Sequence, residues 1–289
     1  MNNLDSTQWT KQRNQQWLRQ IASYLLLTFL AFIFIAPILF MIVGSLKPDE
    51  LVLSEASTLK AFIPQQISLQ NYRDVFERVK FEKFLFNSLF INGTIVLLGL
   101  IVNSLAGYAF ARLRWRGRSL LLIIVVALMI LPLEAIAVPL FFQFTFLGLR
   151  NTYIAQIVPF IANAFSIYLF YTFFADLPQE LEEAARVDGA SPLRTFVEII
   201  VPVSKPVFAT VAILTFLSEW RSLLWALMIT IDERVRPLPL EIATFQTLPP
   251  TQWGDIMSFG VMMVAPILIV FLLFQKWFVK GVASTGTKG

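Results

Sequence analysis

Residues 181–191 read LEEAARVDGAS, a short acidic run in a chain that is otherwise strongly apolar. The 289 residues are 57% hydrophobic and 15% charged, and their mean hydropathy is +0.69. A soluble domain carries about 25% charged residues, so this composition indicates a membrane protein. The sequence contains no histidine and no cysteine, which excludes disulfides, thiol chemistry and histidine-based metal sites. We expect neither a catalytic residue nor a metal site.

Six stretches around this run are long and apolar enough to cross a membrane as helices of about 20 residues. Four of them contain no charged residue, the third contains Glu134, and the fifth contains Glu219 and Arg221. Membrane strands need only about 9–11 residues, so helices fit these lengths better. The predicted fold is an all-α integral membrane protein with six transmembrane helices. The stretches lie at 20–46, 84–111, 119–149, 151–175, 206–231 and 256–275.

The basic residues predict how the spans are oriented, because Lys and Arg concentrate in cytoplasmic loops. Four arginines crowd the tight turn ARLRWRGR, residues 111–118, after the second span. This turn is expected in the cytoplasm, and the even number of spans then places both termini and the acidic run there as well. The predicted organisation is a cytoplasmic segment 1–19, a membrane domain 20–280 that includes a polar loop 176–205, and a cytoplasmic tail 281–289.

The polar loop is predicted to form two short helices. Asp176 is the expected N-cap of the first helix, and Gly189 provides a residue able to take a positive φ at the helix end. Ser191 is expected to cap a second helix that begins at Pro192. The apolar residues of this second helix recur at helical spacing and predict a single stripe: Leu193, Phe196, Val197 and Ile200.

Three interpretations of this loop compete on physical grounds. An inert interfacial helix usually carries Lys and Arg on its wet face, whereas this loop is mainly acidic. A DNA-reading helix-turn-helix is disfavoured because its acids would repel phosphate. The third is a docking element with one side held at the membrane and the other presented to a cytoplasmic partner.

Residues 180–206, ELEEAARVDGASPLRTFVEIIVPVSKP, resemble the EAA loop of ABC-importer permeases. Glu183, Ala184 and Ala185 match the EAA element, and Gly189 matches the glycine that follows it. Ile199 and Pro202 match the closing I-x-x-P. The resemblance is strongest to the carbohydrate-uptake branch of the maltose-permease type, and it extends to SLKP (45–48), FNSLFIN (86–92), GYAFARLRWRGR (107–118) and GTKG (286–289).

This resemblance implies that the two short helices couple the membrane domain to an ATPase subunit. The residues it assigns to coupling are Glu183, Ala184, Ala185, Asp188, Gly189 and Pro202, and those it assigns to a tail contact with the ATPase are Gly286, Lys288 and Gly289. It further implies a second permease, two ATPase subunits, an extracytoplasmic solute-binding protein and surrounding lipid, with no nucleic acid. The chain has no G-x-x-x-x-G-K-[ST] motif, so ATP and Mg²⁺ are expected on the partner ATPase.

Charged residues inside spans cost roughly 2.5–3.5 kcal/mol on insertion scales and usually face a cavity or a partner. The candidates for a sugar path are Glu219, Trp220, Arg221, Asn163 and Glu134. The simpler interpretation is that they join neighbouring helices. Arg221 departs from the resemblance, because family members commonly have an amide at this position.

The predicted function is that of a multi-pass subunit of a sugar importer in the inner or plasma membrane, with a disaccharide or glycoside as the expected cargo. The alternative is a stand-alone secondary transporter or channel. Secondary transporters often show paired repeats with broken helices, and the sequence shows no such halves.

Overall fold

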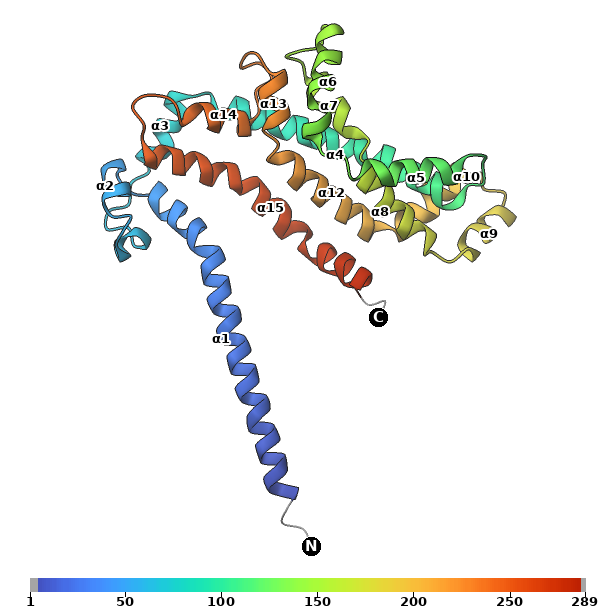
Figure 1. Cartoon of the computed structure of the whole chain (residues 1–289), viewed down its shortest axis with the longest axis horizontal. Coiled ribbons are helices and arrows are strands. Elements are labelled where there is room, and N and C mark those ends of the chain that lie inside the picture. The colour runs from blue at the N-terminus through green and yellow to red at the C-terminus, as the bar shows by residue number, and fades with distance from the viewer. Residues whose placement is uncertain (1–4, 287–289) are drawn as a thin grey trace. The chain divides into compact units, whose positions relative to one another are not determined.

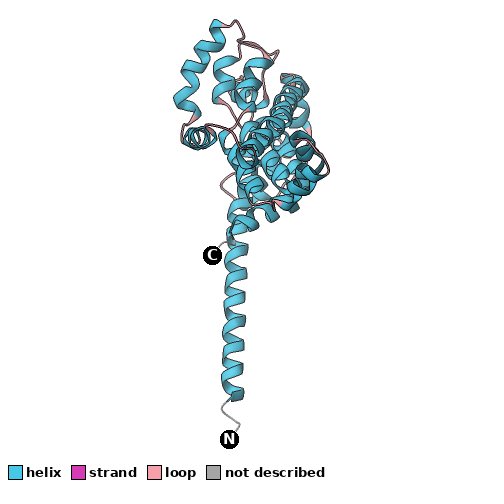
Figure 2. Cartoon of the chain, turned by 90° about the vertical axis from the view of Figure 1, so that its right-hand side faces the viewer, coloured by secondary structure: helices cyan, strands magenta, loops and turns pink. Residues whose placement is uncertain are grey.

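The computed structural model describes the backbone of residues 5–286 and the side chains of residues 16–276. Within that range the chain is helical, with turns and loops between helices and no strand (Figure 2). Four helical stretches are long and apolar enough to cross a membrane, and two bent pairs raise the number to six if each pair is one span. Each predicted stretch overlaps one of these, the fifth only through Lys205–Trp220, so the all-α membrane fold is confirmed.

The four unbent stretches are Gln16–Ser45, Phe81–Arg112, Tyr153–Ala175 and Trp253–Lys276. The first bent pair is α5 (Arg118–Leu128) with α6 (Leu133–Phe146), at 103°. Pro132 precedes α6 in an extended conformation, and proline disfavours a helix at the residue before it. The second pair, Pro192–Val203 with α12 (Lys205–Trp220), bends by 81° at Ser204.

The chain divides into two compact units. The first consists of residues 1–78 and 250–261 and contains α1 (Asp5–Ser45), α2 (Asp49–Ser54), η1 (Leu59–Phe62), α3 (Gln70–Arg78) and the start of α15 (Trp253–Gly286). Its polar core is centred on Lys47, whose buried ammonium group lies 2.9 Å from Glu55 and donates to the carbonyl of Lys60. The Asn71 amide donates to the carbonyls of Ser45 and Lys47 and so satisfies the end of α1.

The second unit consists of residues 79–249 and 262–289 and is built on α4 (Phe81–Arg112). Its other helices are α5, α6, α7 (Tyr153–Ile161), α8 (Ala164–Ala175), α9 (Glu180–Val187), α10 (Pro192–Thr195), η2 (Phe196–Ile200), α11 (Val201–Val203), α12, α13 (Leu224–Ile229) and α14 (Leu238–Phe245). α4 packs against α7, α8 and α12 (Figure 1). Gly107 permits the close approach of α4 and α8, because a Cβ there would lie 2.5 Å from that of Phe170.

Buried amides link the broken helices of this unit. The Asn103 side chain on α4 donates to the carbonyl of Ile161 and accepts from the backbone N–H of Asn163, at the break between α7 and α8. Asn87 donates to the carbonyls of Arg234 and Arg236 and accepts from the hydroxyl of Tyr153. Irregular backbone at membrane depth needs such partners, so these amides join helices.

Candidate functional site

Segment 176–205 folds as two short helical pieces joined by a turn at Gly189. The first piece is α9, and the second runs from α10 through one π-helical turn, η2, to α11. Gly189 has a φ of 76°, and its N–H donates to the carbonyl of Arg186 while that of Ala190 donates to Ala185. The predicted glycine turn is therefore confirmed.

Replacing Gly189 with valine is expected to destabilise this turn, because a left-handed conformation costs a residue with a Cβ on the order of 1–2 kcal/mol. No atom of the described part of the chain lies within 4 Å of the position that a Cβ would occupy, so the cost is conformational rather than steric. Gly189→Asn is the matched control, since asparagine tolerates this region. Limited proteolysis in membranes should cleave the segment faster in Gly189→Val; equal cleavage of the two variants would contradict the assignment.

The structure confirms the predicted cap of the second piece but not that of the first. Ser191 caps α10 as expected, because its hydroxyl accepts from the N–H of Arg194 at 3.3 Å. The prediction that Asp176 begins the first helix is wrong. Asp176 closes α8 as its C-cap, and α9 begins at Glu180 after Gln179. The extra turn of α8 satisfies the N–H of Asp176 through the carbonyl of Thr172.

The inner side of the second piece packs into an aromatic cluster between α4, α8 and α12. Phe196 and Ile200 are buried there against Tyr108, Phe174 and Val207. The Phe196 ring lies 5.0 Å from the ring of Tyr108 and 6.2 Å from that of Phe174, measured between centroids. Aromatic pairs in this geometry add to the free energy of apolar burial, so the second piece is fixed to the end of the membrane helices.

An ion pair fixes the first piece to the end of α4. The Nε of Arg112 lies 3.4 Å from Oε1 of Glu182 on α9, and these side chains are only 6% and 13% exposed. Arg112 also donates to the carbonyl of Leu177. Burial raises the pKa of Glu182, while the charges of Arg112 and Arg186 lower it. The sequence placed Arg112 only among the basic residues of a turn, and no spacing pattern links residues 70 positions apart.

The outer side of the segment is exposed among the residues that the structure describes. Five of the six residues assigned to coupling by resemblance are exposed: Glu183, Ala184, Asp188, Gly189 and Pro202. The sixth, Ala185, is buried. Beside them Val187, Leu193 and Val197 are 88%, 62% and 55% exposed. The predicted single apolar stripe is therefore wrong, because its residues divide between the buried cluster and this outer surface. An acidic and apolar surface on an anchored segment is suited to binding another protein.

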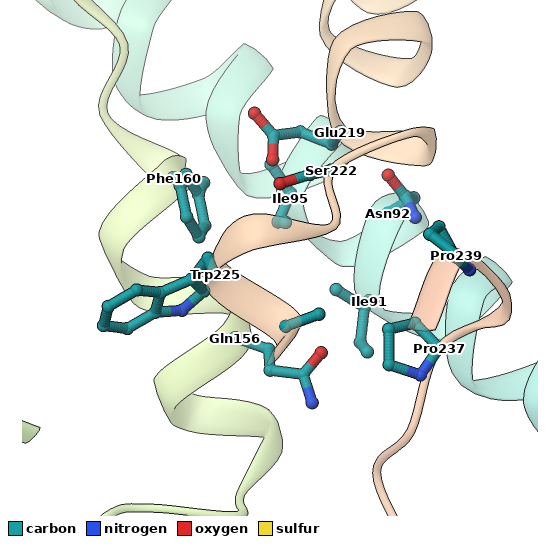
Figure 3. Close-up of a pocket in the computed structure, with 11 residues that line it drawn as sticks. Ile91, Asn92, Ile95, Gln156, Phe160, Glu219, Ser222, Trp225, Pro237 and Pro239 are labelled. Atoms are coloured by element: carbon teal, nitrogen blue, oxygen red, sulfur yellow. The ribbon is translucent and has the colours of Figure 1, made fainter. Parts of the chain in front are cut away.

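A small cavity with both polar and apolar walls lies at the C-terminal end of α12. Glu219 and Ser222 lie next to each other on its wall, with Gln156 of α7 at the other end (Figure 3). The aromatic rings of Trp225 and Phe160 also line it, and Asn92 contributes an Oδ1 that has no hydrogen-bond partner among the described residues. The cavity volume is about 30 Å³, which is space for about two water molecules. The carboxylate of Glu219 makes no ion pair with any side chain among residues 16–276.

The structure separates the other residues predicted for a sugar path. Trp220 is fully buried, donates to the carbonyl of Met263 and stacks on Phe216. Arg221 is exposed just beyond the end of α12. Asn163 caps α8 by accepting from the N–H of Ser166, and Glu134 is exposed in the first turn of α6. Of the five predicted residues, Glu219 alone lines the cavity described above.

Comparison with known proteins decides the family. The model of the family described as binding-protein-dependent transport system inner membrane component matches residues 95–284. The chain belongs to this family. This match covers α4 from Ile95 onward, the whole of segment 176–205 and most of α15. It confirms the resemblance to importer permeases, and the roles assigned to the EAA element stay predictions.

Curated relatives of this permease match along almost its full length. It is 33% identical to an arabinooligosaccharides transport system permease protein of Halalkalibacterium halodurans, over 90% of this chain and 94% of the relative. It is also 33% identical to a trehalose/maltose transport system permease protein of Thermococcus litoralis, with the same two coverages. A solved bacterial ABC transporter involved in the import of the acidic polysaccharide alginate matches with a TM-score of 0.82 and 25% identity, over 91% of this chain and 98% of that one.

The residues predicted for the tail contact fall at the limit of the structure. Lys288 and Gly289 lie outside the described residues, and Gly286 is described only as the last backbone position of α15. The tail contact of the permease therefore stays a prediction.

Proposed function

We propose that this permease is one of two transmembrane subunits of an ATP-driven importer of a sugar or glycoside, located in the cell membrane. Relatives that match along most of the chain are named for the transport of arabinooligosaccharides, trehalose and maltose, and lactose. Membership of the binding-protein-dependent family supports an extracytoplasmic solute-binding protein as the donor of the sugar. The alternative of a stand-alone secondary transporter or channel is not favoured by this membership.

The observation that carries the proposal is the two-sided construction of segment 176–205. Its inner side is fixed to α4 and α8 by the Phe196 cluster and by the Arg112–Glu182 pair. Its outer side presents Glu183 with an apolar surface. A partner that binds the outer side can therefore move the ends of membrane helices. We assign this partner as an ATPase subunit, which binds ATP and Mg²⁺ because the chain lacks a phosphate-binding loop.

In this proposal ATP binding closes two ATPase subunits, and each carries its bound segment toward the other. The Arg112–Glu182 pair transmits the displacement of α9 to α4, and the aromatic cluster transmits that of η2 to α8. α4 also lines the Glu219 cavity through Ile91 and Ile95. Movement of α4 therefore changes the walls of the cavity and opens it to the incoming sugar.

The proposal is tested by purifying an affinity-tagged permease from cells that express its untagged partners. An ATP-hydrolysing polypeptide and a second permease should co-purify, and vesicles containing the complex should take up labelled sugar only with ATP inside and binding protein outside. Uptake by the permease alone, driven by an ion gradient, would contradict it.

The proposed orientation has both termini in the cytoplasm. Because the chain has no native cysteine, single cysteines at Ser119, Ser284 and Gln246 can be labelled without background from this subunit. Ser119 and Ser284 are expected to react with an impermeant maleimide only from the cytoplasmic side, and Gln246 only from outside. Reaction of Ser119 from outside would contradict the orientation.

Glu219 is proposed to contact the sugar once the cavity opens. Glu219→Gln is expected to weaken the apparent affinity for sugar by roughly tenfold to a hundredfold, because a hydrogen bond to a charged group contributes about 1.5–3 kcal/mol. Arg221→Gln is the matched variant, since Arg221 is exposed and does not line the cavity. Uptake kinetics of assembled complexes provide the measurement. Arg221→Gln should retain wild-type transport constants, and wild-type constants in Glu219→Gln as well would contradict a contact between Glu219 and the sugar.

A further inference from the structure

A second and larger cavity lies at the other end of α4, where the basic turn leads into α5. It has a volume of about 470 Å³ and is lined by Trp115 and Gly117 of the turn, by Arg118, Ser119, Leu120 and Leu122 at the start of α5, and by Tyr171 of α8. α5 and α8 are in contact. Nothing in the coupling mechanism or in the sugar path uses this cavity.

The cavity is basic. None of its lining residues is acidic, and Arg114 and Arg116 are exposed on the same turn. The Arg118 guanidinium donates to the carbonyls of Leu113 and Ala111. These two hydrogen bonds hold the guanidinium in place, but a neutral carbonyl does not compensate its positive charge. Across residues 16–276 no ion pair joins Arg114, Arg116 or Arg118 to an acid. In contrast, Arg112 is neutralised by Glu182.

The cavity opens onto an apolar helix surface. Leu120 and Ile123 on α5 are both about two-thirds exposed, as expected for side chains that face lipid tails. Trp115 and Tyr171 provide the aromatic side chains that are enriched at the level of lipid headgroups. Trp115 is held by a hydrogen bond from its ring N–H to the carbonyl of Ala109 and by packing on Phe110. A ligand here would therefore meet cationic groups at one end and an apolar surface at the other.

We propose that this cavity binds the headgroup of an anionic phospholipid from the cytoplasmic leaflet. The phosphodiester would contact Arg118 and the Ser119 hydroxyl, Arg114 and Arg116 would add long-range attraction, and one acyl chain would lie along Leu120 and Ile123. Basic pockets between membrane helices on the cytoplasmic side bind anionic headgroups in this way. The apolar surface of α5 favours a lipid over a free phosphate ion. The inference rests on the cytoplasmic position of the turn, which the Ser119 labelling experiment tests separately.

The test uses the purified importer complex in detergent, titrated with phosphatidylglycerol or with phosphatidylcholine of the same acyl chains, with bound lipids counted by native mass spectrometry. Arg118→Gln is expected to weaken phosphatidylglycerol binding by about tenfold, the effect of one lost charged hydrogen bond. Phosphatidylcholine, whose choline cation is repelled by Arg114 and Arg116, should bind the wild type more weakly than phosphatidylglycerol does. Ser119→Glu, at an exposed position, should act in the same direction by charge repulsion. Arg19→Gln is the matched control, an exposed arginine at the expected cytoplasmic end of α1 that does not line the cavity.

Three results would overturn the proposal. Phosphatidylglycerol binding that is equal in wild type, Arg118→Gln and Ser119→Glu would show that no headgroup occupies the cavity. Displacement of the bound lipid by millimolar inorganic phosphate would identify a site for a soluble anion. Loss of the ATPase subunits from Arg118→Gln, with lipid binding retained, would identify the cavity as part of a protein interface.

Discussion

Replacing Glu183 with lysine is expected to abolish sugar uptake while the membrane helices remain folded. Glu183 is exposed on α9, so the change removes no internal contact of the chain. If it faces a basic residue of the ATPase, the substitution removes an ion pair and introduces repulsion. Losing one partner of an interfacial charge pair costs about 2–5 kcal/mol, which corresponds to roughly thirtyfold to several-thousandfold weaker docking.

This expectation is measured by the amount of ATPase subunit that co-purifies with the tagged permease and by sugar-stimulated ATP hydrolysis. Glu233→Lys is the matched control, because Glu233 is an exposed acid between α13 and α14 whose ion pair with Lys80 is itself exposed. Such surface pairs contribute little to stability, so this variant should behave as wild type. Wild-type assembly and uptake in Glu183→Lys would show that Glu183 is not part of the docking surface.

Arg112→Gln is expected to uncouple ATP hydrolysis from transport without removing the ATPase. The substitution leaves the largely buried carboxylate of Glu182 without its partner, at a cost of about 2–3 kcal/mol, somewhat below that of breaking a fully buried pair. α9 should then detach from the end of α4 while its outer side still binds the ATPase. The double variant Arg112→Gln with Glu182→Gln contains no unpaired charge and is expected to recover part of the coupling.

The pH dependence separates this positioning role from a merely structural one. Burial raises the pKa of Glu182 above its ordinary value, so the contribution of this group to stability is complete at acid pH and falls as the pH rises through its pKa in the folded protein. The positive charge of Arg112 lowers the pKa of Glu182. Without Arg112 this pKa is higher, so the loss of stability that accompanies ionisation of Glu182 extends to higher pH. The defect of Arg112→Gln should therefore be smaller at mildly acid pH than at mildly alkaline pH. A defect that is independent of pH, or equal in the single and double variants, would contradict the pairing.

Sequence predicted the parts of the structure that depend on local pattern. The six apolar stretches follow from the length that a bilayer requires, and Gly189 and Ser191 follow from the backbone demands of a helix end. The Arg112–Glu182 pair could not be predicted, because it joins segments that meet only after α4 and α8 have packed. The burial of Phe196 and the exposure of Leu193 could not be predicted for the same reason. Periodicity shows which residues share a helix face, but not which other helices pack against that face.

The sugar-path residues show the limit of predicting a site from proximity in sequence. Glu219, Trp220 and Arg221 are consecutive, yet α12 ends at Trp220, and the three side chains reach a cavity, a packed interior and the surface respectively. Other polar side chains that line the same cavity come from distant helices: Asn92 from α4 and Gln156 from α7. Only the packing of the helices brings these groups together.

The central claim is that the outer side of segment 176–205 docks on an ATPase subunit, and site-specific crosslinking tests it most directly. Val187 is 88% exposed on this side, and Phe146, at the end of α6, is 91% exposed far from it in sequence. Each is replaced by cysteine in the otherwise cysteine-free chain and labelled with a photoactivatable maleimide in the assembled complex. The account predicts a crosslink to the ATPase subunit from position 187, altered in yield by ATP, and none from position 146. No ATPase crosslink from position 187, or an equal yield from both positions, would contradict it.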